Sequence, residues 1–447
     1  MQTVQGRCGS PAPSQSPVRR LGIAALLASV LTGMVWPVMA ATAPVTPTET
    51  PSRPAADAAD LSLPEMLQTL AQHPALQAAA AEVAALRARL PAASALPDPM
   101  LSTRIAHVGV NRWSLGIEPM SNIGLMVEQA YPHPIKLQLR EQQAYRQLLA
   151  AESRQEVLSR QLRQQVIVAY LSLVRLRQSL DLNAELQQQL KQLEPLTAAY
   201  VSLNQLPQEA LWQLQLEQSQ LQNQALALQG EQADTLHQLQ EITQRSLPGD
   251  LHLAFPTLSG LPSDLHGLQA GLSQHPQRIE QAHQRVLAEL DLAQAEAALS
   301  PDFVLGGGLS NRLVLEPMWE LRFGMTLPAY SAQKQLPEIA GARHALSSRT
   351  ADEETLARQL QRQLAQSWSQ QQIARQQHQL YQRQLLPAAH QRLEASLARF
   401  ASRQAPLSEV LERLRNWLQL QQEALAAESQ YYLAWASLEY FSGQAIF

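Results

Sequence analysis

The sequence contains two copies of one long unit, and this internal repeat limits the chain to folds that are built twice. The stretch HPALQAAAAEVAALRARL begins at His73, and HPQRIEQAHQRVLAELDL begins at His275, an offset of 202 residues. In each copy a proline, Pro99 or Pro301, follows the histidine by 26 residues, within the similar stretches LPDPML and SPDFVL. Both copies are therefore predicted to have the same succession of elements.

The two proline-containing stretches are predicted to be joints between a helix and a strand. Proline lacks a backbone N–H and moves the residue before it out of the helical region, so Pro97 and Pro99 end a helix while Asp98 tolerates the turn. The following stretches alternate between apolar and polar residues: LSTRIAHV and NIGLMVEQAY in the first copy, DFVLGGGLS and MWELRFGMTL in the second. This period of two predicts a pair of β-strands in each copy.

Long helices are predicted after each strand pair. From about residue 135 to 202 the sequence lacks glycine, and apolar residues recur close to every 3.5 residues. This pattern predicts a helix roughly 100 Å long, which turns at LNQLPQ and returns over about 208–245. The second copy is predicted to run from about 333 to 399, turn at ASRQAPLS and return to about 440. A shorter helix is predicted over about 61–90, and kinks are predicted at Pro195 and Pro387.

The amino-terminal residues have the layout of an export signal. Residues 1–40 contain two adjacent arginines, the apolar run LGIAALLASVLTGMVW and the small-residue exit VMA. This layout is typical of a cleaved signal peptide, with a retained membrane anchor as the alternative. Residues 41–60 carry too little apolar surface to fold and are predicted to form a flexible segment. The only cysteine, Cys8, precedes the apolar run, so we expect no disulfide, cysteine ligand or cysteine nucleophile in the exported chain.

The charge and motif content argue against several classes of function. Lys and Arg number 34 and Asp and Glu 38, and removal of the three arginines of residues 1–40 leaves a net charge of −7, which does not suggest a nucleic-acid partner. No two of the eleven histidines have a helical spacing of three or four residues, so no metal site is expected. Gly306–Gly308 lacks the lysine of a phosphate loop and is interpreted as close strand packing. We predict no enzyme and no cofactor.

Four strands cannot close a barrel alone. Tilted strands of about nine to eleven residues can cross a bilayer, but a single-chain barrel needs at least about eight strands. An open edge in lipid would leave backbone groups unpaired. Three copies of the chain would supply twelve strands. The alternative is an ordinary soluble β patch on a coiled-coil protein.

The order of these features resembles the TolC-like outer-membrane efflux protein family, and the details most resemble its heavy-metal and cation efflux branch. The resemblance rests on the two His-Pro helix starts, the joints LPDPML and LSPDFVL, the prolines after the strands (Pro132 and Pro328) and the paired hairpin turns. It implies a mainly α fold with a small β part. Long helical hairpins would form a trimeric α-barrel tunnel, and four strands per chain would contribute to a shared 12-stranded transmembrane β-barrel.

The resemblance also implies a domain organisation and a role. The expected parts are a signal peptide (1–40), a flexible segment (41–60), a first repeat (61–246), an equatorial linker (247–262) and a second repeat (263–447). The expected protein is a homotrimer in outer-membrane lipid, mostly periplasmic, that serves as a passive exit duct for metal cations. Its expected partners are a periplasmic adaptor and an inner-membrane RND-type pump. A periplasmic coiled-coil adaptor, or a TolC-like channel for drugs or secreted proteins, remains an alternative.

Two sets of site residues follow from the resemblance. The adaptor-docking tips fall on Asn204, Gln205, Leu206, Pro207 and Gln208 in one turn and on Arg403, Gln404, Ala405, Pro406, Leu407 and Ser408 in the other. The acidic positions that narrow the family's periplasmic entrance fall on Glu409 and Glu412. Their spacing of three places both on one helical face. The alternative is that both are solvated and pair with Arg413 or Arg415.

The turns depart from the family pattern. The family's Tyr-x-x-Gly keeps its tyrosine as Tyr200 but has Phe400 in the second copy, and its glycine falls on Leu203 and Arg403. The arginine that latches some members falls on Ala405. The chain also lacks the cysteine for an amino-terminal lipid, so membrane anchoring is expected to rest on the barrel.

Overall fold

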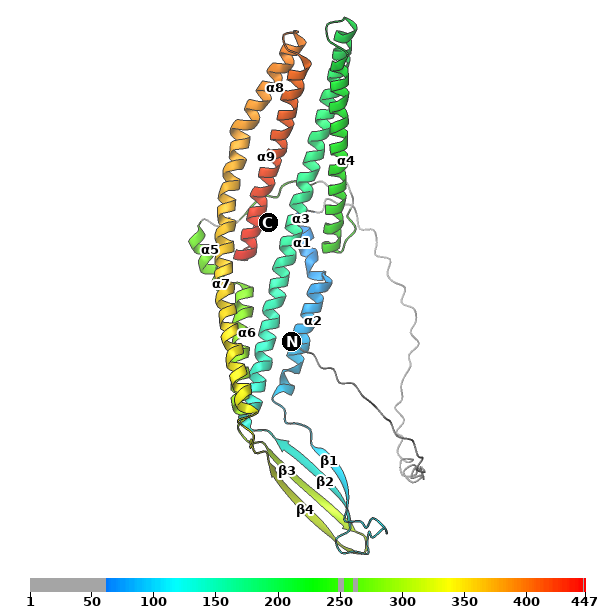
Figure 1. The fold of residues 1–447 in the computed structure, drawn as a ribbon, viewed down its shortest axis with the longest axis vertical. Coiled ribbons are helices and arrows are strands. Elements are labelled where there is room, and N and C mark those ends of the chain that lie inside the picture. Colours follow the sequence, from blue (N-terminus) through cyan, green and yellow to red (C-terminus); the bar gives the residue numbers. More distant parts are fainter. Residues whose placement is uncertain (1–61, 248–252, 260–263, 445) are drawn as a thin grey trace, which may run out of the picture. The chain divides into compact units, whose positions relative to one another are not determined.

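The computed structural model describes residues 62–247, 253–259, 264–444 and 446–447, all of which belong to one compact unit that spans residues 58–447. The expected signal peptide at 1–40 and flexible segment at 41–60 lie outside the described residues. Helices dominate, and two pairs of strands interrupt them at equivalent places in the two repeats (Figure 1). The mainly α architecture with a small β part is confirmed.

The first repeat follows the predicted order of elements. These are α1 (Leu63–Thr69), a 3₁₀ turn (Leu70–Gln72), α2 (Pro74–Ala93), β1 (Met100–Ala106), β2 (Asn122–Tyr131), α3 (Pro134–Ser202) and α4 (Glu209–Thr243). The helix predicted over about 61–90 is present in two pieces, because the chain breaks at His73, which is extended with φ −64° and ψ 131°. Pro74 explains the break, since proline disfavours the helical region for the residue before it.

Two His-Pro pairs start their helices with the same cap. The Nδ1 atom of His73 accepts the N–H of Ala75 at 3.1 Å, and that of His133 accepts the N–H of Ile135 at 3.4 Å. Because proline at the first helical position has no N–H, the histidine ring serves the next unpaired amide. The start at His133 has the same sequence signal but is not among those that the repeat predicts.

The second repeat has the same order with one interruption. Its elements are α5 (Leu265–Gly271), a 3₁₀ turn (Leu272–Gln274), α6 (Pro276–Ala297), β3 (Phe303–Arg312), β4 (Leu315–Met325), α7 (Gln335–Leu380), α8 (Leu386–Ala401) and α9 (Leu407–Ser442). A π-helical turn at Tyr381–Leu385 separates α7 from α8. Pro387 explains it, since a wider turn relieves the clash between the proline ring and the preceding turn. By contrast, α3 continues through Pro195 to Ser202.

The four strands form one antiparallel sheet in the order β1-β2-β3-β4. The hairpins β1–β2 and β3–β4 are those predicted within the repeats. Between them, β2 pairs with β3 from Tyr131 opposite Phe303 to Ile123 opposite Asn311. This central pairing joins the two repeats and leaves β1 and β4 as the edges of the described sheet.

The long helices pack around α3, which contacts α2, α4, α6 and α9. The hairpins α3–α4 and α8–α9 have their turns at the same end, and the strands lie at the opposite end of α3 (Figure 1). Near the turns one apolar cluster combines Leu214, Phe400 and Val410 from both hairpins. A second cluster, around Ile167 and Leu239, joins α1, α3 and α4. Among the described residues, no helix has both the length and the apolar character needed to cross a membrane.

A buried carboxylate fixes the end of α9. Glu439 is 5% exposed, pairs with Arg163 of α3, and accepts the backbone N–H groups of Ile446 and Phe447 at 2.7 and 3.1 Å. The backbone N–H of Ser259 donates to Ile446 O at 3.1 Å. Segment 253–259 and the residues after α9 are thus held against the middle of α3.

His275, at the start of α6, lies in the same region. It is 1% exposed, its ring packs 5.4 Å from that of Tyr440, and neither ring nitrogen has a hydrogen-bond partner among the described residues. Burial and, secondarily, the nearby Arg160 charge lower the pKa of His275 from its usual 6.5 to about 4. The folded protein therefore keeps this histidine neutral in a range where the unfolded chain binds a proton.

We predict that His275 destabilises the protein in mild acid. Because its folded pKa is lowered, its full contribution to stability is present above pH 6.5 and is lost as the pH falls from about 6.5 to about 4. His275→Leu should reduce the fall in thermal unfolding midpoint between pH 7 and pH 5, measured by circular dichroism in detergent. His73→Leu, at the half-buried equivalent position, should not. Equal pH dependence in His275→Leu and the parent protein would contradict the prediction.

Candidate functional site

The sheet has one strongly apolar face. Alternate residues of all four strands place large apolar side chains on it, and most are exposed. The most exposed are Leu101, Ile105, Leu125, Leu309, Trp319, Leu321 and Phe323. Trp319, Leu321 and Phe323 are 68–74% exposed and stand side by side on the edge strand β4. A contiguous apolar surface of this kind marks an interaction with another apolar phase.

The opposite face of the sheet is polar and carries balanced charges. Arg104 of β1 pairs with Glu320 of β4, and Arg322 of β4 pairs with Glu128 of β2 at 2.5 Å. These residues alternate with the apolar set along the strands, as period-two geometry requires. Two arginines and two glutamates leave this cluster with no net charge. The sequence pattern predicts the polar face, but it does not predict which charges meet.

Glycines in β3 leave room for the polar side chains that extend over neighbouring strands on the same face of the sheet. Gly308 of β3 lies against β2 so closely that a Cβ there would stand 2.6 Å from Leu125 O, and Gly306 lies beneath the Glu128 side chain. At Gly307, on the other face, the nearest atom would be 3.8 Å away. Close packing, expected for the whole Gly306–Gly308 run, therefore applies to Gly306 and Gly308 but not to Gly307.

The joint between α6 and β3 is a second polar site, and the sequence did not suggest a partner for its aspartate, Asp302. One carboxylate oxygen of Asp302 accepts the Nζ–H of Lys136 and the backbone N–H of His133, both at 2.8 Å. Burial alone would raise the pKa of Asp302, but these hydrogen bonds outweigh it and the pKa is lowered. Lys136 also donates to Ser300 O at 2.8 Å. Asp302 thus ties the second repeat to the start of α3.

The two hairpin turns share one backbone geometry. Asn204 and Arg403 adopt left-handed φ values of 58° and 63°. In each turn the next amide closes a hydrogen bond: Gln205 N–H donates to Tyr200 O at 2.8 Å, and Gln404 N–H donates to Arg399 O at 2.7 Å. Leu203, which stands at the family's glycine in the first turn, has φ −85°, and the left-handed residue is the next one, Asn204. Asparagine tolerates the left-handed conformation better than leucine.

A cavity of about 360 Å³ lies between the two turns. It is lined by Tyr200, Gln205, Leu206, Phe400, Arg403 and Ala405. The Tyr200 hydroxyl donates to Ala401 O at 3.0 Å, its ring meets that of Phe400 edge-on at 5.8 Å, and the Arg403 guanidinium lies 5.4 Å from its centre. Tyr200 therefore links the two hairpins. Its attraction for the Arg403 cation stabilises a left-handed arginine that is otherwise strained.

The expected docking residues divide into exposed and buried groups. Exposed side chains are those of Asn204, Gln205, Pro207, Gln208, Arg403, Gln404, Pro406 and Ser408. Leu206 is half-buried and lines the cavity. Ala405 and Leu407 are 9% and 2% exposed and belong to the interior of the hairpin ends. Leu407 packs in the cluster with Phe400 and Val410, so its side chain supports the turn and does not present a contact surface.

The two expected gate carboxylates have different surroundings. Glu409 is half-buried and pairs with Arg399 across the turn at 2.9 Å. Glu412 is 67% exposed and lies 3.2 Å from the guanidinium of Arg413. Arg415 pairs with the buried Glu217 of α4 and not with either gate carboxylate. The alternative pairing is thus present for Glu412 with Arg413, whereas the partner of Glu409 is a residue that the sequence did not suggest.

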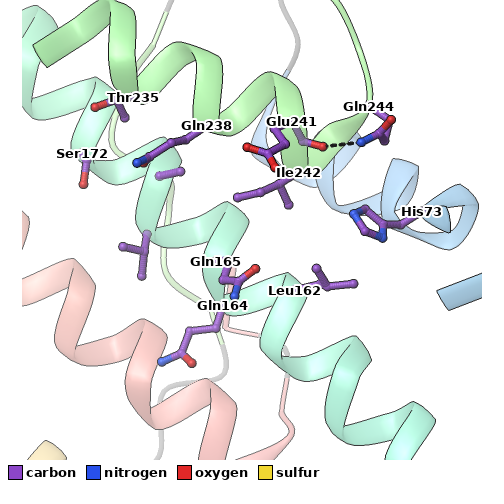
Figure 2. Close-up of a pocket in the computed structure, with 12 residues that line it drawn as sticks. His73, Leu162, Gln164, Gln165, Ser172, Thr235, Gln238, Glu241, Ile242 and Gln244 are labelled. Carbon is purple, nitrogen blue, oxygen red and sulfur yellow. Dashed lines mark hydrogen bonds between the residues drawn. The ribbon is translucent and has the colours of Figure 1, made fainter. Parts of the chain in front are cut away.

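A cavity of about 700 Å³ lies between α3 and α4 beside the start of α2 (Figure 2). Figure 2 shows that its side chains are mostly amides and apolar groups, including Gln164, Gln165 and Gln238, with Glu241 as the carboxylate. Gln244 donates to Glu241 O at 2.7 Å. In the described chain, no three His, Cys, Asp or Glu residues gather as metal ligands would. The chemistry of this surface is that of neutral hydrogen bonding.

The fold matches solved structures of outer-membrane proteins. CusC, whose crystal structures address folding and transmembrane channel formation, aligns at 17% identity with a TM-score of 0.74, over 87% of this chain and 93% of CusC. The outer-membrane channel OprN aligns at 16% identity and 0.75, over 86% and 90%. The outer membrane protein VceC of Vibrio cholerae aligns at 15% and 0.73, over 86% and 96%. No protein-family model and no curated protein gives a significant match to the sequence.

This chain has the fold of the outer-membrane channel proteins. The TM-scores and the coverage of both chains establish that similarity over nearly the whole described unit. The fold that the resemblance to the TolC-like family predicted is therefore confirmed, and CusC is among the structures that share it.

We predict that Gly308→Ala weakens the sheet and that Gly307→Ala does not. A methyl group at Gly308 must displace the β2 backbone at Leu125, whereas one at Gly307 meets an ordinary contact distance. Overpacking of this kind costs about 1–3 kcal/mol. The measurement is the midpoint temperature for loss of ordered structure by circular dichroism in detergent, with Gly307→Ala as matched control. Equal midpoints for the two variants would show that β2 and β3 do not approach so closely.

Proposed function

We propose that the protein is an outer-membrane channel, a passive exit duct of a tripartite efflux system. The observation that carries this proposal is the sheet. One face is apolar and exposed, the other carries ion pairs with no net charge, and both edges of the described sheet are unpaired. The apolar face suits lipid, and the charged face suits a water-filled lumen. The fold shared with CusC and OprN supports the same conclusion.

The open edges support a homotrimer. Backbone groups on β1 and β4 cannot remain unpaired in lipid, because no water is available to hydrogen-bond them. Pairing β4 of one copy with β1 of the next satisfies both edges, and three copies close a twelve-stranded barrel. The long hairpins would then form the tunnel below it, in the periplasm.

The hairpin tips are the proposed docking surface for a periplasmic adaptor that receives cargo from an inner-membrane RND-type pump. Both tips expose uncharged glutamine beside the cavity, and Arg403 adds one positive charge. We propose metal cations as the cargo, supported by the resemblance to the cation branch and by the carboxylates of Glu409 and Glu412 near the tip. A channel for drugs or secreted proteins has the same architecture and differs only in cargo.

The channel proposal is tested by function in a membrane. The purified full-length protein should insert into planar bilayers and give discrete conductance steps, and cell fractionation should recover it with outer membranes. A periplasmic coiled-coil adaptor, the alternative class, would be recovered in the soluble periplasmic fraction and would give no conductance.

Deletion of the gene in its native host should sensitise the cells to metal salts. Sensitivity confined to drugs would overturn the proposed cargo and leave the channel intact.

We predict that the gate carboxylates set cation selectivity. In a trimer, Glu409 and Glu412 would each form a ring of three charges, and such rings favour cations. Glu409→Gln with Glu412→Gln should lower cation selectivity and weaken block by a trivalent cation added from the periplasmic side. Arg399→Gln removes the cation paired with Glu409, so it should raise cation selectivity and strengthen block by the trivalent cation. The matched control is Glu231→Gln, an exposed carboxylate on α4. Unchanged selectivity in the double variant would place these groups outside the pore.

We predict that charge at the exposed tip positions blocks docking. Gln205 and Gln404 occupy equivalent positions in the two turns and are exposed. A desolvated, unpaired carboxylate in an interface costs several kcal/mol. Gln205→Asp with Gln404→Asp should therefore fail to complement a deletion strain while keeping conductance. Gln222→Asp, on the exposed side of α4, is the control. Full complementation by the double variant would show that docking does not use the turns.

A further inference from the structure

Lysine is rare in this chain, and its positions follow the repeat. It occurs at only three places, residues 136, 191 and 334, whereas arginine supplies nearly all other positive charge. Lys136 lies in the first turn of α3, directly after the strands of the first repeat. Lys334 immediately precedes α7, in the connection that follows the strands of the second repeat. Each repeat therefore has one lysine where its strands pass into its long helix.

Each repeat also has one aspartate where the helix before the strands, α2 or α6, passes into them. Asp98 lies in LPDPML, before β1, and Asp302 lies in SPDFVL, before β3. A backbone carbonyl of each joint accepts a hydrogen bond from the second strand of the same repeat or the residue after it. Gln129 Nε2 donates to Pro97 O at 2.7 Å, and the Thr326 backbone N–H donates to Asp302 O at 2.9 Å. The two joints are therefore similarly placed in the fold as well as similar in sequence.

The equivalence fails for the aspartate side chains. Asp302 accepts Lys136 Nζ and His133 N–H at 2.8 Å, because β3 pairs with β2 and so lies beside the exit from the first repeat. The side chains of Asp98 and Lys334 are both exposed, and within the described part of the chain neither side chain has a hydrogen-bond or ion-pair partner. They cannot meet in one chain by the same geometry, since β1 and β4 are opposite edges of the sheet. One aspartate and one lysine are left with complementary charges.

We propose that Asp98 of one protomer pairs with Lys334 of a second copy, repeating between chains the contact that Asp302 makes with Lys136 within one chain. This inference rests on the proposed function, because it requires β4 of one copy to pair with β1 of the next. The closed ring then contains six equivalent joints, three within chains and three between them. The pair fixes the register of the seam, because a slip of β4 along β1 separates the two charges.

The burial at the internal joint indicates how the seam pair is arranged. The Lys136 side chain is 13% exposed where it meets Asp302, and it also donates to Ser300 O at 2.8 Å. A lysine held by a carboxylate and a carbonyl has a fixed direction, and these two acceptors replace part of the hydration that it loses on burial. We expect Lys334 to become similarly shielded on assembly, with Asp98 and a joint carbonyl of the second copy as its acceptors.

Cysteine crosslinking tests the pair in the full-length protein. In a Cys8→Ser background, which removes the only cysteine, Asp98→Cys with Lys334→Cys should give covalent dimers and trimers on denaturing gels after treatment with a short flexible bismaleimide. The linker is needed because an aspartate–lysine pair spans more than a disulfide can bridge. Asp302→Cys with Lys136→Cys should react but stay at monomer size, since that joint lies within one chain. Each single variant, treated in the same way, should run only at monomer size on denaturing gels.

The outcomes separate this inference from the proposed function. The parent protein, without crosslinker, should migrate as a trimer on a gel when the sample is not heated. If it does so but the Asp98→Cys/Lys334→Cys variant gives only monomers on denaturing gels after crosslinking, the pair is overturned and the channel stands. If the parent itself forms no trimer, the proposed function fails first. A charge swap gives a second reading: Asp98→Lys should lower the temperature at which the trimer dissociates, and adding Lys334→Asp should restore it. Failure of the swap to restore any of the lost stability also overturns the pair.

Discussion

The pairing of β2 with β3 is the interaction on which the rest of the structure depends. Each repeat alone supplies a two-stranded hairpin, and an isolated hairpin is at best marginally stable in water. The nine-residue ladder from Tyr131 to Ile123 unites both hairpins into one sheet. It also brings Asp302 to the start of α3, so the direction in which the first long helix leaves the sheet is set by a residue of the second repeat.

The duplicated sequence folds into two similar halves, and their similarity is seen at both ends of the long helices. At the turns, Asn204 and Arg403 adopt the same left-handed conformation, and Tyr200 and Phe400 pack against each other across the two hairpins. At the strand end, a backbone carbonyl of each Pro-Asp joint accepts a hydrogen bond from the end of its own strand pair, from the Gln129 side chain in one repeat and the Thr326 backbone in the other. The halves differ at the sheet edges, because β1 and β4 have no neighbouring strand on their outer sides in the described sheet. This difference is what a ring of identical chains would remove.

The sequence predicts the order of elements, both strand pairs and both long hairpins, because period-two and 3.5-residue patterns record which side of each element is apolar. The helix predicted over about 61–90 breaks at His73, where Pro74 overrides a continuous apolar pattern, and the sequence does not indicate that Asn204 is the left-handed residue of the first turn. It cannot predict that Glu409 meets Arg399 or that Arg104 meets Glu320. Those contacts depend on how separate elements are aligned with one another in space. A pattern of apolar and polar residues does not specify which of many arginines lies opposite a given carboxylate.

The central claim is that three copies close one barrel through the pairing of β4 with β1. Electron cryomicroscopy of the full-length protein in lipid nanodiscs tests it most directly. We expect a threefold-symmetric particle in which β4 of each copy lies antiparallel to β1 of the next, with Trp319, Leu321 and Phe323 facing lipid and Arg322 facing the lumen. A monomeric particle, or a sheet whose edges are covered by anything other than a second copy of this chain, would contradict the account.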